Sequence, residues 1–400
     1  MFKISTLNQE EYLNIVTTPT PNLKLLQIMP SLLCDARCKH CHIWGNQGWA
    51  LQESKNNVTE QLDVEILKQF IDDALWQHNT KNFWVLITGG EALLYKHIFT
   101  LIDFLNQRQL PIILLSNGSQ LKKISEYIVE SVSSLTISLD GPEFVHDSIR
   151  NKKNLFKDAC ESILRIIKVK EQKKSLLPGI TINCTISPFN IEHIKEFIKT
   201  LESLLGVHNI KLKFDINSIS SSKDIAINFE PLLHTKTDSG IKYEQLMKRY
   251  LNSDASSTWR SFIADNIDMD VKPIKKYLLD LWEQHGVDHS KFVDLEEYFF
   301  NYNNVFNRIR CQNPWSTIMI RQNGDVHFCP DLKDFCLGNI YQSEFKEIWN
   351  GEKAINFRNY LSNNLFPICN RCCSLFIDYN WPPIKWPLPK KDSSKNVVKS

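Results

Sequence analysis

The residues with the clearest chemical signature are Cys34, Cys38 and Cys41, which follow the spacing C-x3-C-x2-C. Soft thiolate ligands select iron–sulfur clusters or zinc. A closed structural zinc site normally has four ligands, whereas three thiolates can hold three corners of a cubane and leave its fourth iron open. The triplet therefore predicts either a cluster with a vacant iron or a zinc knuckle completed by His40 or His42.

A second group of thiols lies near the C-terminal end of the sequence, at Cys311, Cys329 and the C-x2-C pair of Cys369 and Cys372. Between the first two, apolar stretches flank a Gln-Asn-Gly-Asp turn, which predicts a β-hairpin over residues 318–328. A hairpin flanked by cysteines, followed by a helix and a C-x2-C pair, can bring four thiolates together. By chemistry alone, four thiolates fit zinc and an iron–sulfur cluster equally well.

The elements that must position these thiols follow from the hydrophobic pattern. Apolar strand-like runs alternate with amphipathic helical patterns, and strands separated by such helices imply parallel βαβ units. The predicted strands are 23–29, 83–88, 111–116, 134–139, 179–187 and 208–214, and the predicted helices are 61–79, 97–109, 119–130, 155–170 and 191–205. We therefore expect an α/β fold in which a parallel sheet occupies the first half of the chain.

Polar residues and glycines follow several of the predicted strands. The cysteine triplet follows the first strand, Gly89, Gly90 and Glu91 follow the second, and Asn117 follows the third. The fourth strand leads into Ser138-Leu-Asp140-Gly. In parallel β/α barrels the chemistry lies at the C-terminal ends of the strands, so we expect these residues to converge.

This ordered set of motifs resembles the radical S-adenosylmethionine (radical SAM) superfamily over residues 20–215. The resemblance implies a partial (β/α)6 barrel, an open relative of the eightfold barrel. It also implies an enzyme whose [4Fe–4S] cluster, held by Cys34, Cys38 and Cys41, chelates S-adenosylmethionine through its open iron. Reduction of the sulfonium would then release a 5′-deoxyadenosyl radical that abstracts hydrogen, so the cofactor supplies the difficult chemistry.

The same resemblance assigns cofactor contacts. Gly89 and Gly90 allow close backbone approach, and Glu91 offers an anion to the methionyl ammonium. His40 stands at the family's aromatic position, where a ring packs on adenine, although a surface histidine is an equal reading. The other implied contacts are Ser138 and Asp140 near the ribose, Asn117 as a backbone or cofactor contact, and Arg150 as a carboxylate partner or a loop salt bridge.

The C-terminal thiols resemble the SPASM/twitch extension of radical SAM enzymes, which carries auxiliary [4Fe–4S] clusters. The full SPASM pattern continues with more cysteines than this chain has, which predicts the shorter twitch form with one auxiliary cluster. Its implied ligands are Cys311, Cys329, Cys369 and Cys372, and Cys336 or Cys373 could replace one of them. Such a fully ligated cluster has no vacant iron for substrate, so we expect it to serve electron transfer or structural support.

The remaining segments complete the expected organisation. We predict a helical insertion over 216–308, a small α+β twitch/SPASM-like domain over 309–378 and a disordered tail over 387–400. This insertion either packs on the open side of the barrel or serves as a substrate lid or docking surface.

Composition limits the partners and the compartment. The 400 residues are 42% apolar and carry a net charge of +2, which gives no long-range field for nucleic acid or a membrane. The sequence shows no signal peptide and no apolar run long enough to span a bilayer. Its 11 cysteines therefore indicate metal ligands and reduced thiols, and we expect a cytoplasmic protein.

The substrate is the least defined feature. We expect maturation of a peptide or protein by radical cross-linking, oxidation or epimerisation, with a reductant such as flavodoxin or ferredoxin. The alternatives are oxidation or rearrangement of a small metabolite, and a non-catalytic metal-binding or partner-binding protein. Sulfatase-maturing relatives have an aspartate where this chain has Pro330, so we do not expect formylglycine formation. Only 33 residues precede Cys34, so a peptide would need a separate carrier or direct docking.

Overall fold

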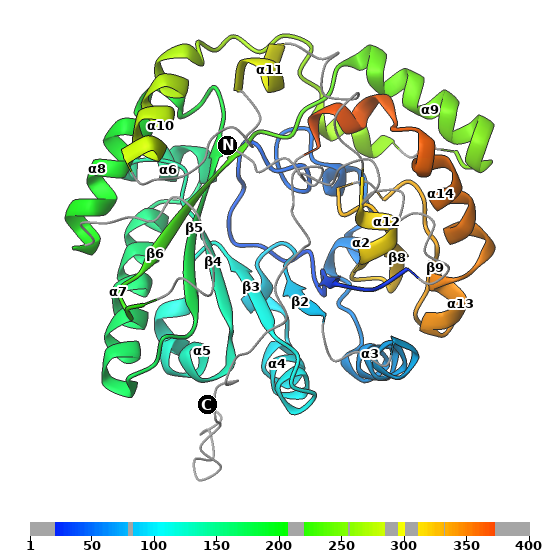
Figure 1. Cartoon of the computed structure of the whole chain (residues 1–400), viewed down its shortest axis with the longest axis horizontal. Coiled ribbons are helices and arrows are strands. Elements are labelled where there is room, and N and C mark those ends of the chain that lie inside the picture. The colour runs from blue at the N-terminus through cyan, green and yellow to red at the C-terminus, as the bar shows by residue number, and fades with distance from the viewer. Residues whose placement is uncertain are drawn as a thin grey trace.

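The fold is built on one curved sheet of nine strands, in the order β6-β5-β4-β3-β2-β1-β7-β8-β9 (Figure 1). The computed structural model describes residues 21–78, 83–206, 220–254, 257–284, 295–300, 311–331 and 333–372. Six neighbouring strands, β1 to β6, are parallel to one another. This arrangement confirms the expected partial β/α barrel.

The barrel strands are short and largely apolar because helices cover their outer side. They are β1 (Leu25–Ile28), β2 (Trp84–Ile87), β3 (Ile112–Ser116), β4 (Ser134–Ser138), β5 (Gly179–Ile186) and β6 (Ile225–Pro231). The first five lie inside five of the predicted strands. The sixth predicted strand, 208–214, lies outside the described residues.

The sixth strand of the sheet lies instead in the segment that we expected to be a helical insertion. Within β6, Ile225, Ile227 and Phe229 are buried, whereas Asn228 and Glu230 are only partly buried. This period of two is typical of a strand with two different faces. The expectation that 216–308 is helical therefore fails at 225–231, where the alternation was overlooked.

The helices that cover the barrel lie on the convex side of the sheet, as Figure 1 shows for α3, α4, α5, α7 and α8. Their bounds are α3 (Val64–His78), α4 (Ile98–Gln107), α5 (Ser125–Ser131), α6 (Glu143–Arg150), α7 (Leu155–Lys173) and α8 (Ile194–Leu205). All except the short α6 overlap helices predicted from periodicity. After β6 come α9 (Thr237–Leu251), a 3-10 helix (η6, Ser257–Phe262), α10 (Lys272–Gln284) and α11 (Leu295–Phe300).

The C-terminal part extends the barrel sheet. Strand β7 (Thr317–Ile320) pairs in parallel with β1, and its four residues are all buried. Strands β8 (Asp325–His327) and β9 (Gly338–Asn339) follow in antiparallel order, which confirms the predicted hairpin. The remaining elements are α12 (Asn313–Ser316), α13 (Phe345–Trp349), α14 (Glu352–Asn363) and a 3-10 helix (η8, Pro367–Arg371).

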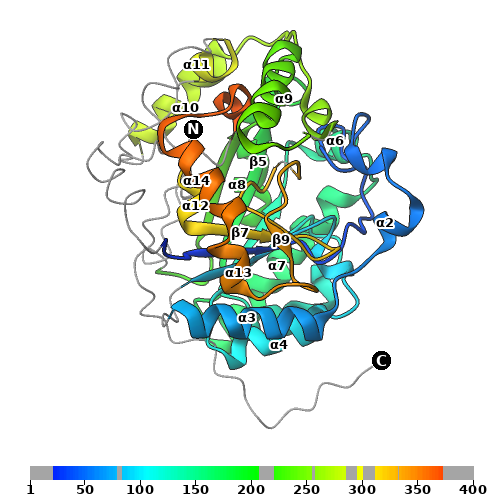
Figure 2. The ribbon, with the colours of Figure 1, turned by 90° about the vertical axis from the view of Figure 1, so that its right-hand side faces the viewer.

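This C-terminal part, yellow to red in Figure 2, is joined to the barrel by a common core. The Phe345 ring of α13 packs edge-on against Phe70 of α3, with 5.6 Å between the ring centroids. The backbone N–H of Phe345 also donates to Asp73 across 2.6 Å. The two predicted domains are therefore parts of one sheet and one core in the described residues.

Candidate metal centres and active site

The loop that carries the cysteine triplet begins just after β1 and is held by local contacts. The Cys41 N–H donates to the Cys38 carbonyl, and the Gly45 N–H donates to the Cys41 carbonyl. A Cβ at Gly45 would lie 2.5 Å from the Cys41 oxygen, so this turn requires glycine. The Trp44 indole donates to the Leu32 carbonyl across 2.6 Å and fastens the loop to the end of the strand.

Each sulfur of the triplet accepts a hydrogen bond from nitrogen. The donors are the Ala36 N–H to Cys34 at 3.4 Å, the Trp44 N–H to Cys41 at 3.3 Å and Arg150 Nη1 to Cys38 at 3.6 Å. Such bonds stabilise cluster-bound thiolates and tune the cluster potential.

Burial raises the pKa of Cys34 to about 12 and also raises the pKa of Cys38. A bound metal would supply the positive charge that these buried thiolates need. Three soft donors with thiolate-stabilising contacts therefore fit the expected cluster.

The two glycines after β2 approach the chain's own backbone just ahead of the cysteines. A Cβ at Gly90 would lie 2.3 Å from the Leu33 oxygen, and one at Gly89 would lie 2.5 Å from the Ser31 oxygen. Gly89 also has a φ of +138°, which side chains rarely adopt. The close approach predicted for these glycines thus seats the start of the cysteine loop against the end of β2.

Glu91 connects the ends of β2 and β3. Its carboxylate accepts hydrogen bonds from Ser116 Oγ at 2.9 Å, the Asn117 N–H at 2.7 Å and the Leu93 N–H at 3.2 Å. Only 1% of Glu91 is exposed, and burial raises its pKa to about 7 although these hydrogen bonds oppose the shift. In this structure the carboxylate therefore binds the chain itself.

Asp35, which the sequence analysis passed over, ties the cysteine loop to the residues that follow β3 and to the loop between α6 and α7. It accepts hydrogen bonds from Asn117 Nδ2 at 2.8 Å, Ser119 Oγ at 2.8 Å and Lys152 Nζ at 2.5 Å. Burial opposes its ionisation, but the hydrogen bonds prevail and lower its pKa to about 2. Gln120 Nε2 also donates to Asp35, at 3.2 Å. No local pattern marks Asp35, because these partners are all more than 80 residues away in the sequence.

Asp140 and Arg150 form a buried ion pair behind Cys38. Arg150 Nε donates to Asp140 Oδ2 across 2.6 Å, and the Thr185 N–H donates to Asp140 Oδ1 across 3.0 Å. His40 Nε2 lies 4.0 Å from the same carboxylate, and burial lowers the pKa of His40 to about 4. Of the two roles predicted for Arg150, the structure shows the salt bridge.

Ser138, the last residue of β4, lies opposite Asn183 of β5. Asn183 belongs to a polar set on β5 and β6 that the sequence analysis also missed. Its side-chain amide donates to Glu230 at 3.0 Å, and Asn228 Nδ2 donates to Asn183 at 2.7 Å and to Glu230 at 3.0 Å. The signal was available in the polar positions that alternate with apolar ones along these strands.

The four cysteines predicted as auxiliary ligands line one cavity. Cys311, Cys329, Cys369 and Cys372 surround it together with Tyr243 of α9, and its empty volume is about 570 Å³, part of it open to solvent. Burial raises the pKa of Cys369, and the neighbouring Cys311 and Cys329 raise it further. A four-thiolate set in a half-open cavity fits an iron–sulfur cluster. The described residues that line it do not include Cys336, and Cys373 lies outside the described residues.

Arg321, directly after β7, lies between the two thiol sites. Its Nη2 donates to the carbonyl of Pro330, next to Cys329, at 3.2 Å, and its Nη1 lies 3.9 Å from the sulfur of Met29 ahead of the cysteine loop. Only 3% of Arg321 is exposed. On the side of the cysteine loop, the ring of Phe262 in η6 stacks on His42 with centroids 5.0 Å apart.

Both segments that carry the thiol sites match models of known protein families. Residues 28–201 match the radical SAM superfamily, and residues 311–373 match SPASM, an iron–sulfur cluster-binding domain. None of the helices in the described ranges is both long and apolar enough to cross a membrane.

Two curated proteins are similar to most of the chain. One is the serine-type anaerobic sulfatase-maturating enzyme of Bacteroides thetaiotaomicron, 22% identical over 391 residues, which cover 90% of this chain and 83% of that protein. The other is AlbA of Bacillus subtilis, an antilisterial bacteriocin subtilosin biosynthesis protein. It is 23% identical over 327 residues, which cover 79% of this chain and 57% of AlbA.

Among solved structures, Streptococcus suis SuiB bound to S-adenosylmethionine has a TM-score of 0.55 at 13% identity, covering 85% of this chain and 68% of SuiB. SuiB bound to its precursor peptide SuiA has a TM-score of 0.54. These likenesses establish the shared fold. The two family matches give the cofactors as a [4Fe–4S] cluster with S-adenosylmethionine and auxiliary iron–sulfur clusters. The chain therefore belongs to the radical SAM superfamily and is an enzyme that carries a SPASM domain after its barrel.

Proposed function

We propose that this radical SAM enzyme matures a peptide or protein by hydrogen abstraction. The names of its two curated relatives refer to sulfatase maturation and to the biosynthesis of the bacteriocin subtilosin, and SuiB has been solved with a precursor peptide. The main support for the proposal is that one sheet joins the three-thiol loop to the four-thiol cavity. When bound, the cluster and S-adenosylmethionine supply the 5′-deoxyadenosyl radical.

In this proposal the chain's own residues hold the reactive centre rigidly. Cys34, Cys38 and Cys41 bind the first cluster. Asp35 and Asn117 fix the loop against β3 through the 2.8 Å hydrogen bond between them. Because these contacts join the ends of separate strands, the loop is preorganised before any ligand binds.

The proposed contacts to S-adenosylmethionine surround that loop. His40 is a neutral ring that can pack on adenine, since burial keeps its pKa near 4. The other proposed contacts are Gly89, Gly90, Glu91, Asn117 and Ser138. We assign Asp140 and Arg150 a positioning role. They bind each other most strongly, and Arg150 also donates to the sulfur of Cys38.

We place substrate docking on the helices that follow β6. This segment contacts both thiol sites, through Phe262 against His42 and through Tyr243 in the wall of the four-cysteine cavity. In Figure 1, α9, α10 and α11 lie along the upper rim, beyond the end of the barrel strands. A peptide held there would approach the loop of Cys34, Cys38 and Cys41. A protein such as flavodoxin or ferredoxin is the proposed electron donor.

The experiment compares two substrate classes in the reconstituted, anaerobic protein with S-adenosylmethionine and dithionite. One reaction receives a pool of synthetic peptides of mixed sequence, and the other receives free amino acids and common metabolites. We expect the peptide pool to raise 5′-deoxyadenosine formation. It should also yield peptides that lose two hydrogens or gain solvent deuterium, according to mass spectrometry.

The control is the variant in which Cys34, Cys38 and Cys41 are all alanine, which should form no 5′-deoxyadenosine with either pool. Stimulation by the metabolite pool alone would overturn the peptide proposal in favour of small-molecule chemistry. A mass change at serine or cysteine that matches formylglycine would show that Pro330 does not exclude that reaction.

A further inference from the structure

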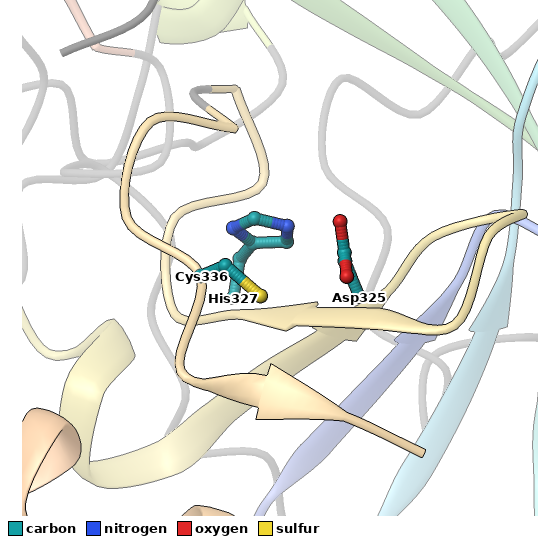
Figure 3. A group of neighbouring side chains, drawn as sticks. All are labelled: Asp325, His327 and Cys336. Carbon is teal, nitrogen blue, oxygen red and sulfur yellow. The ribbon is translucent and has the colours of Figure 1, made fainter. Parts of the chain in front are cut away.

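A third group of metal-ligand side chains lies on the hairpin, apart from both thiol sites. Asp325 and His327 come from β8, and Cys336 lies two residues before β9. One ligand atom from each lies within 4.8 Å of the other two. Figure 3 shows the carboxylate, the imidazole ring and the sulfur gathered on one side of the hairpin. From the sequence, Cys336 is expected only as a possible replacement for one of the four auxiliary cluster ligands.

The hydrogen bonding of His327 leaves one of its ring nitrogens available as a metal ligand. Its Nδ1 lies 3.1 Å from the Phe335 carbonyl, and because a carbonyl can only accept, Nδ1 carries the hydrogen. The lone pair is therefore on Nε2, which has no hydrogen-bond partner among the described residues. His327 is only 1% exposed. Buried polar atoms without a partner are rare, and a bound ion is one of the few explanations.

The surroundings of the group match those of known metal sites. Metal-binding histidines usually donate their other ring nitrogen to a carbonyl or carboxylate, as His327 does. The carboxylate of Asp325 is oriented by Asn339 Nδ2 at 2.9 Å and by Asn323 Nδ2 at 2.7 Å. Each carboxylate oxygen keeps a lone pair for a further bond. Asp325 also lines a solvent-open hollow beside Lys333, which gives an ion a path to the group.

We propose that Asp325, His327 and Cys336 bind a single zinc-class divalent ion. Zinc takes sulfur, imidazole and carboxylate ligands, and sites with three protein ligands keep a fourth position for water. A tetrahedral ion holds its ligands about 3–4 Å apart, so small side-chain rotations close the present spacing. One carboxylate and one thiolate also neutralise a divalent ion. Such a site is distinct from a four-thiolate cluster in both donor set and size.

The test uses the anaerobic protein with its full complement of iron, incubated with zinc sulfate and then desalted. We expect about one zinc per chain by mass spectrometry of the metals. X-ray absorption at the zinc edge should show one sulfur near 2.3 Å and nitrogen or oxygen neighbours near 2.0–2.1 Å. Absence of retained zinc overturns the proposal. Zinc bound to three or four sulfurs also overturns it, because that ion would occupy a cluster site.

Two variants separate this site from the auxiliary cluster. Cys336→Ser should remove the sulfur neighbour and weaken zinc retention at least tenfold, with iron content unchanged. A loss of iron in this variant would identify Cys336 as a cluster ligand and overturn the zinc proposal. Asp325→Asn should weaken retention about as much while keeping the sulfur neighbour. The matched control is Cys160→Ser on α7, which makes the same change at a thiol buried in the barrel core and should leave zinc and its neighbours unaltered.

Discussion

The guanidinium of Arg150 donates to the sulfur of Cys38 across 3.6 Å, and both side chains are buried. The same guanidinium is paired with Asp140, so the position of its Nη1 is fixed by a second buried charge. Arg150 thus connects Asp140, two residues after β4, to Cys38, a proposed cluster ligand. From this connection we predict separate effects on the free energy of unfolding and on the reduction potential of the cluster.

Removing the charge of Arg150 alone should destabilise the folded protein. Arg150→Gln leaves the fully buried carboxylate of Asp140 without its cation, and we expect the free energy of unfolding to fall by about 3–5 kcal/mol. Adding Asp140→Asn removes the uncompensated charge and should restore part of that loss. Anaerobic urea unfolding of the two single variants and the double variant measures this coupling. Additive losses would show that the two side chains do not stabilise each other.

The double variant also isolates the hydrogen bond to Cys38, because it keeps the net charge of the site. Loss of a hydrogen bond to a ligand sulfur makes a cluster harder to reduce. We expect the potential of the first cluster to become more negative by about 60 mV, a tenfold change for one electron. A redox titration followed by electron paramagnetic resonance gives the value. Lys39→Arg, in the same loop, keeps the charge and is the control, which should leave the potential unchanged.

Glu91 should make stability depend on pH. In the folded protein, burial raises the pKa of the Glu91 carboxyl to about 7, so this group stays protonated up to about that pH. In the unfolded chain its ordinary pKa of 4.5 applies. Between these values the folded state binds more protons, so the free energy of unfolding should fall as pH rises, by roughly 3 kcal/mol in total. Glu91→Gln should remove most of this slope. Unfolding midpoints at pH 5 and pH 8 test it, and an equal slope in both proteins would contradict the assignment.

The four-cysteine cavity should be needed for product but not for cleavage of S-adenosylmethionine. The sulfurs of the first loop accept their hydrogen bonds from Ala36, Trp44 and Arg150, none of which belongs to the cavity. We therefore expect Cys369→Ala or Cys372→Ala to abolish the modified peptide and preserve some 5′-deoxyadenosine. Chromatographic measurement of both products in soluble variants tests this. Full product yield without the second cluster would favour a redox-neutral reaction.

Prediction from sequence succeeded where the signal was local. The first five barrel strands and the hairpin each depend on short patterns, and the structure contains all of them. The four C-terminal cysteines line one cavity, and their role as cluster ligands stays a prediction. Strand β6 was missed because its alternating run from Ile225 lies after a segment already interpreted as loop and insertion. Asp35 and Arg321 could not be predicted, since their roles depend on partners distant in sequence. The Asp325, His327 and Cys336 group is likewise assembled only by the fold of the hairpin.

The central claim is that two separate sets of cysteines hold two iron–sulfur clusters. The direct measurement is iron and sulfide content after anaerobic reconstitution, for the wild type and for the variant with Cys34, Cys38 and Cys41 all changed to alanine. We predict about eight iron and eight sulfide per chain in the wild type, and about half of each in the variant. Stoichiometric zinc bound to four sulfurs, with little iron in the anaerobically purified wild type, would contradict the account.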